Sequence, residues 1–151
     1  NYATVEPDPA EAREAAFRSA AWSPVDASVI PLQARAALID DPEPDGIGLL
    51  LRIDLSGVAV EQRDGRWIGS LEVMVLQRDR QGLRHGPAES KRIGLHMDQP
   101  TYEDARKNGL LWPYRLPRQK DATELKIIVR DNTTGALGSV TLPHSRMEAV
   151  R

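Results

Sequence analysis

Apolar and polar residues alternate along most of the chain, and this alternation predicts β-strands. In the stretch 123–142, TELKIIVRDNTTGALGSVTL, aliphatic residues alternate with Lys126 and Arg130. A period of two is typical of a half-buried strand whose charged side chains face water. The Asp, Asn and Gly residues of 131–135 then favour a turn. The alternation resumes in SVTL, so this stretch predicts a hairpin, which needs further strands to cover its apolar face.

Six other stretches show the same alternation and are separated by turns roughly every ten residues. With the hairpin they make seven or eight strands, and Pro113 makes the last of the six an edge strand. The six cover residues 29–39, 48–55, 58–62, 67–78, 90–97 and 110–116. No alternation of strands with helices is present, so the pattern predicts an all-β fold, an immunoglobulin-like or fibronectin-like antiparallel β-sandwich.

One helix is expected before the strands. Asp8 is placed to cap it, Pro9 suits its first turn, and the alanine-rich run continues to Ala21. The segment 101–107 predicts a single helical turn. The resulting organisation is an N-terminal extended segment and helix over 1–25, a sandwich over 26–146 and a C-terminal tail over 147–151.

The residues on the apolar side of each predicted strand also predict the hydrophobic core. We expect it to include Leu32, Leu51, Ile53, Trp67, Leu71, Val73, Val75, Leu95, Leu125, Ile127, Val129 and Val140.

The bulk composition narrows the possible partners. The chain has 151 residues, a net charge of -2 and no cysteine, which suits one domain with an arm and excludes a disulfide scaffold. Such a charge predicts no nucleic-acid partner. No apolar run is long enough to span a bilayer, and no signal-peptide pattern is present. The opening Asn1-Tyr2, without an initiator Met, predicts a piece of a longer chain or a mature chain.

Candidate metal ligands are scattered. The histidines are His85, His96 and His144, and no two of them have the spacing of metal ligands. The acidic loop 40–45 offers carboxylates to calcium, but two prolines stiffen it and the calcium-loop pattern is missing. We interpret it as a solvated loop, with calcium binding left open. No cofactor is predicted.

Two short motifs suggest chemistry that their surroundings do not support. Asp54 and Ser56 follow an apolar strand, as in a metal-adhesion motif, but Val58 takes the place of the second serine. The segment 132–134 matches an N-glycosylation site and equally suits a turn. No serine lies in a Gly-x-Ser-x-Gly elbow and no phosphate-binding loop is present. We therefore predict a non-enzymatic domain.

Aromatic residues are the remaining candidates for ligand contact. Trp67 shares the apolar parity of its strand, which favours a place in the core. Trp22, Trp112 and Tyr114 flank less regular segments. Exposed aromatic rings of this kind stack on sugars. The competing interpretation is that they pin the helix and the edge strand to the core.

Several stretches together resemble one family. Near the N-terminus these are the opening Asn-Tyr, the PDPAEA segment of the expected helix (7–12), and AWSPVDA (21–27) followed by IPL (30–32). Further along they are DGRWIG (64–69), VRD (129–131), TG (134–135) and GSV (138–140). The chain resembles the C-terminal immunoglobulin-like region of von Willebrand factor type A-related proteins of the acidobacterial kind. The resemblance covers nearly the whole chain and implies an exported or cell-envelope location. It also implies an upstream type A domain that carries the metal site, and it assigns no functional residues to this region.

Three functions follow as hypotheses. The first is a non-catalytic accessory domain that supports, spaces or mediates protein contacts for an upstream domain of the same chain. The second is a carbohydrate-binding module that uses Trp22, Trp112 and Tyr114. The third, which needs scattered carboxylates and His96 to converge in a cleft, is a hydrolase.

Overall fold

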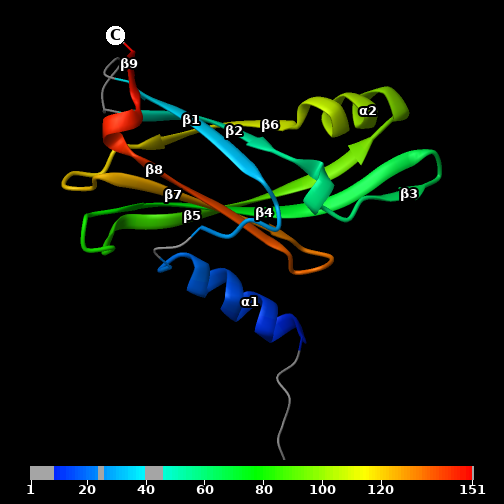
Figure 1. Ribbon diagram of the computed structural model, residues 1–151, viewed down its shortest axis with the longest axis horizontal. Coiled ribbons are helices and arrows are strands. Elements are labelled where there is room, and N and C mark those ends of the chain that lie inside the picture. Colours follow the sequence, from blue (N-terminus) through cyan, green and yellow to red (C-terminus); the bar gives the residue numbers. More distant parts are fainter. Residues whose placement is uncertain (1–8, 24–25, 40–45, 151) are drawn as a thin grey trace, which may run out of the picture.

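A computed structural model describes residues 9–23, 26–39 and 46–150. It confirms the all-β sandwich. Two sheets lie face to face, and helix α1 (Pro9–Ala20) lies against the outer side of one of them, as Figure 1 shows. None of the helices in the described ranges is long and apolar enough to cross a membrane.

The smaller sheet has four strands in the order β6-β2-β1-β9. β1 and β2 form an antiparallel pair, and β6 adds to the other side of β2. β6 is therefore an edge strand, as Pro113 predicted. β9 lies beyond the predicted sandwich and pairs with β1 in parallel. The bounds are β1 Leu32–Ile39, β2 Gly46–Ile53, β6 Leu110–Pro117 and β9 Glu148–Val150.

The larger sheet has five strands arranged around β4. β5 pairs with one side of β4, while β3 and β7 pair with successive parts of the other side, and β8 completes the sheet beside β7. The β7–β8 pair is the predicted hairpin. The bounds are β3 Glu61–Arg63, β4 Arg66–Arg78, β5 Arg84–Met97, β7 Glu124–Asp131 and β8 Leu137–Pro143.

The segment predicted as a single helical turn is a longer helix, α2 (Gln99–Asn108). Asp98 caps it by accepting a hydrogen bond from Thr101 N at 2.9 Å. Gly109, at φ 85°, ends it and leads into β6. α2 therefore connects the two sheets at one end of the sandwich, as Figure 1 shows. Two short 3-10 helices, η1 (Leu55–Gly57) and η2 (His144–Arg146), lie at other connections.

The main core fills the space between the sheets, and the predicted core residues lie there. Nine of the twelve are buried, and Leu32, Trp67 and Val140 are half-buried against the same cluster. Trp67 stacks on Tyr102 of α2 with ring centroids 4.0 Å apart. Ile30 and Ile47 are also fully buried in this core, although the sequence did not single them out.

A second, smaller apolar cluster lies on the outer side of the larger sheet. Phe17 and Ala21 from the α1 end pack there on Leu76 and Ile128. The prediction that Lys126 faces water is therefore wrong, because its side chain is fully buried. The helix and the chain that follows it cover this side of β7, so the strand is buried on both faces rather than on one.

Candidate functional site

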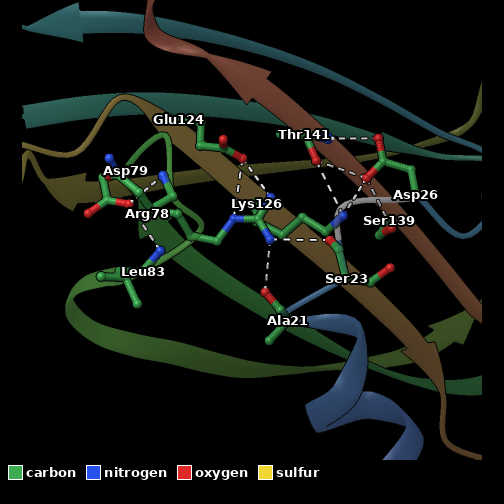
Figure 2. Close-up of polar contacts among 11 residues, drawn as sticks. Ala21, Ser23, Asp26, Arg78, Asp79, Leu83, Glu124, Lys126, Ser139 and Thr141 are labelled. Atoms are coloured by element: carbon green, nitrogen blue, oxygen red, sulfur yellow. Dashed lines mark hydrogen bonds and ion pairs between the residues drawn. The ribbon is translucent and has the colours of Figure 1, made fainter.

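An ion pair between a buried lysine and a partly exposed aspartate holds the segment that follows α1 onto the larger sheet. Lys126 Nζ donates a hydrogen bond to Asp26 Oδ1 at 2.5 Å, and the Lys126 side chain has no exposed surface. Lys126 Nζ also lies 3.2 Å from Thr141 Oγ1. Figure 2 shows the two side chains meeting beside β8. A lysine inside a sheet face needs such a partner, because an unpaired buried charge is very unfavourable.

The Asp26 carboxylate is bound from several directions. Thr141 donates to it from its hydroxyl at 2.9 Å and from its backbone N at 3.2 Å. Partial burial alone would raise the pKa of Asp26, but the hydrogen bonds from Lys126 and Thr141 and the lysine charge together lower it. Asp26 is therefore ionised at neutral pH, as the pairing with Lys126 requires.

Arg78 forms the second part of this network. Its guanidinium lies 2.6 Å from Glu124 Oε2 through Nη2, and Nη1 donates to the carbonyl oxygens of Ala21 and Ser23 at 3.1 and 3.2 Å. Arg78 is nearly completely buried. These two carbonyls lie just past the end of α1, where backbone acceptors lack partners within the helix. Arg78 therefore fixes the end of the helix, as Figure 2 shows.

The middle of the helix is also attached to the sheet. Arg130 pairs with Glu14 and lies over the Phe17 ring, 4.5 Å from its centroid. Arg13 donates to the carbonyl oxygen of Thr133 at 3.0 Å. Polar contacts thus flank the Phe17 cluster, and α1 is an integral part of the domain.

Trp22 lies beside this network and is 54% exposed. It lines a hollow of about 450 Å³ together with Asp26, Arg80, Gln81 and Glu124. An exposed ring next to several polar side chains is an arrangement that sugar-binding sites use.

Trp112 and Tyr114 lie elsewhere, on β6 of the smaller sheet. Their rings are stacked with centroids 4.7 Å apart and both are half-buried against the main core. Tyr114 OH donates to Glu89 at 2.7 Å, and burial, with the Glu89 hydrogen bond and charge, raises the pKa of Tyr114 to about 12. The fold therefore does not bring the three predicted aromatic residues into one platform.

The outer side of the smaller sheet forms a distinct surface, which we call the basic face. It consists of the outward residues of β1, β2 and β6, which alternate with the core residues, and it includes Arg35, Gly48, Leu50, Arg52, Leu111 and Arg115. Among the outward residues of these three strands, none is an aspartate or a glutamate. Leu50 and Leu111 are 41% and 58% exposed.

The basic face is hollowed at its centre. A depression of about 550 Å³ is lined by Arg35, Gly48, Leu50, Pro113 and Arg115 among others. A second hollow of about 180 Å³, lined by Arg52, Arg106 and Lys107 with Asp54, continues toward the end of α2. Both hollows have cationic side chains at their margins.

The candidate metal ligands do not assemble within the described part of the chain. In the described ranges, no three His, Asp or Glu side chains lie close enough to hold a metal ion. His85 Nε2 lies 2.8 Å from Asp79 Oδ2 in the β4–β5 turn, and His96 is exposed on β5. The acidic loop 40–45 lies outside the described residues.

The two short motifs serve local structure. Asp54 Oδ1 accepts a hydrogen bond from Ser56 N at 2.9 Å and so caps η1. Asn132 Nδ2 donates to Ser70 Oγ at 2.9 Å, which ties the β7–β8 turn to β4.

Sequence reasoning missed Lys126, Arg78 and Asp26 as a network. One signal was available in the sequence. Ile128 is apolar although it lies on the same side of β7 as Lys126 and Arg130. An apolar residue there indicates that something covers the second face of the strand.

Comparisons with protein-family models, curated proteins and solved structures give no match to this chain.

Proposed function

We propose that this chain is a non-catalytic accessory domain that mediates protein contacts. The observation that carries the proposal is the basic face, on which Leu50 and Leu111 are exposed between arginine side chains. Exposed apolar side chains gathered in one patch are typical of interaction surfaces. Arginine is also enriched at protein interfaces, where its planar group binds in several ways.

The attachment of α1 supports an accessory role. The buried charges Lys126 and Arg78 are engaged in holding the helix and the segment after it. Any domain joined ahead of α1 would thus be connected to a rigid element. We propose, from the resemblance of the AWSPVDA, DGRWIG and VRD stretches, an exported protein with an upstream von Willebrand factor type A-like domain.

The test of this proposal has two parts. The purified chain is assayed against ester, glycoside and peptide substrates, and the expected result is no turnover. Leu50→Asp is then compared with the unchanged chain for binding to a candidate protein partner, and the expected result is loss of binding without loss of folding. Turnover that follows the chain through purification would overturn the proposal.

A second function is favoured by one observation, the hollow beside Trp22 with its polar lining. A carbohydrate-binding module would stack a sugar on this ring and bind its hydroxyls through the neighbouring polar groups. In a thermal-shift panel of polysaccharides, Trp22→Ala should abolish any shift that the unchanged chain shows. Leu111→Ala, at an exposed apolar residue on β6 of the other sheet, is the matched control. A shift retained in Trp22→Ala would exclude this site.

A further inference from the structure

We propose that the basic face docks an extended protein segment that carries carboxylates beside apolar side chains. This inference rests on the proposed function and names the chemistry of the partner.

The charges on the basic face favour a partner of negative charge. The whole chain has a net charge of -2, yet the outward residues of β1, β2 and β6 contain arginines and no acidic residue. Acidic positions lie at the borders of the face, where Glu148 of β9 is in register with Ala37 and Asp54 follows β2. A predominantly cationic patch on a molecule of negative net charge attracts ligands of the complementary charge. A carboxylate-bearing segment is complementary to it. A second copy of this chain that presents the same face would bring arginine against arginine.

Two arginines have donors to offer. Within the part of the chain that the structure describes, neither Arg115 nor Arg52 makes a hydrogen bond or a close ion pair. The charge of Arg52 does reach the Asp54 carboxylate, where it contributes, after the hydrogen bonds from Ser56, to the lowered pKa of Asp54. A Cβ added at Gly46 would lie 3.2 Å from Arg115 Nε, and one at Gly109 would lie 2.7 Å from Arg52 Nε. The Arg115 side chain thus runs across Gly46 of β2, whereas the Arg52 side chain runs beside Gly109 at the end of α2. A guanidinium in this position can bind a carboxylate with two parallel hydrogen bonds.

The register of the strands places apolar contacts between these cations. Leu50 of β2 pairs with Pro113 of β6, and the neighbouring outward pairs are Gly48 with Arg115 and Arg52 with Leu111. Leu111 therefore lies directly opposite Arg52, and Leu50 and Pro113 lie one row away from both arginines. A segment that alternates acidic and apolar side chains matches this arrangement.

The dimensions fit an extended segment. Four outward positions along a strand span about 20 Å, and three strands span about 10 Å across. About six residues of extended chain cover that length. The second hollow, which Asp54 lines together with Arg106 and Lys107, continues beyond Arg52, so the segment meets two further cations and one carboxylate at that end.

The test uses two fluorescent peptides of about ten residues, because the natural partner is unidentified. One contains glutamates with two leucines, and its twin has glutamine in place of every glutamate. Binding is measured by anisotropy with the full chain at low and high salt. The glutamate peptide should bind, should weaken as salt rises, and should bind more tightly than the twin.

Single variants locate the binding. Arg115→Gln and Arg52→Gln should each weaken binding of the glutamate peptide about fivefold to tenfold. Arg92→Gln, an exposed arginine on β5 of the other sheet, removes the same charge and should leave binding within about twofold. Melting curves of all variants confirm that they fold.

The outcomes separate this inference from the proposed function. If Leu50→Asp weakens both peptides while the arginine variants bind normally, the face binds protein but not through carboxylates, and the inference fails alone. If neither peptide binds, or if only vesicles of anionic lipid bind, the inference is overturned. If a defined protein partner also ignores Leu50→Asp, the proposed function fails with it.

Discussion

Lys126 Nζ lies 2.5 Å from Asp26 Oδ1, and the two ends of this pair have very different environments. The lysine side chain is fully buried, whereas the aspartate side chain is 40% exposed. Removing Lys126 therefore leaves an aspartate that water can solvate, whereas removing Asp26 leaves a lysine that water cannot reach.

The first prediction follows from this asymmetry. Asp26→Ala leaves the Lys126 charge buried without its carboxylate and should lower the free energy of unfolding by about 3 kcal/mol. Lys126→Met keeps most of the side-chain volume and leaves an aspartate that water can solvate, so it should cost less than about 1.5 kcal/mol. Chemical denaturation of both variants measures the difference.

The exposed pair of Glu61 and Arg63, 3.2 Å apart, provides the control. Glu61→Ala should change the free energy of unfolding by less than about 1 kcal/mol. If Lys126→Met proved as damaging as Asp26→Ala, the account of the buried charge would be wrong.

Phe17 should determine whether α1 stays on the sheet. Its side chain is 2% exposed and packs on Leu76 and Ile128. Phe17→Ala should lower the free energy of unfolding by about 3 to 5 kcal/mol, or should detach α1 while the two sheets stay folded. Hydrogen exchange would then show early exchange over α1 with the sheets still protected. Phe17→Leu, which retains much of the volume, should cost clearly less, and normal protection of α1 in Phe17→Ala would contradict this prediction.

Asp131 should be the most sensitive residue of the β7–β8 turn. It is fully buried, and its carboxylate accepts hydrogen bonds from Thr133 N at 2.8 Å and from Ala59 N at 2.7 Å. Asp131→Ala leaves both donors without their acceptor and should cost about 3 kcal/mol in thermal or chemical unfolding. Thr134→Ala, which removes an exposed acceptor in the same turn, should cost less than about 1 kcal/mol, and equal losses would refute the assignment.

His144 should make stability depend on pH in the mildly acidic range. Burial, and then the charge of Arg118, lowers the pKa of His144 in the folded chain, which Glu124 opposes in part. As the pH falls, His144 is therefore protonated at a higher pH in the unfolded chain than in the folded chain. The contribution of neutral His144 to the free energy of unfolding should be complete above about pH 6.5, the ordinary pKa of histidine. This contribution should decline as the pH falls toward the pKa of His144 in the folded chain.

Denaturation at pH 7.5 and 5.5 measures this decline. His144→Gln should reduce it, while His96→Gln, at an exposed position, should leave it unchanged. A decline of equal size in His144→Gln would show that other groups cause it.

Much of the sandwich could be predicted because its strands bury one face each. The alternation in 67–78 and 123–142 marked β4 and the β7–β8 hairpin, and Pro113 marked the edge strand. Lys126 was misplaced because the alternation describes only one strand at a time. The cover over its second face comes from α1, about 110 residues earlier in the sequence, and no local pattern records that contact.

The candidate surfaces were less predictable for the same reason. Arg52 and Arg115 lie on separate strands, and each looks like an ordinary polar position in its own alternation. They share a surface because β2 and β6 pair in one register. The aromatic residues showed a different limit. The sequence groups Trp22 and Trp112 by residue type, whereas the fold places Trp22 after α1, beside the larger sheet, and Trp112 on β6 of the smaller sheet.

The most direct test of the central claim is an NMR titration of the isotope-labelled chain with the glutamate peptide. The account predicts shifts in the backbone amides of Gly48, Leu50 and Leu111, which diminish in Arg115→Gln. Shifts confined to residues around Trp22 and Gln81, with the basic face unperturbed, would contradict it.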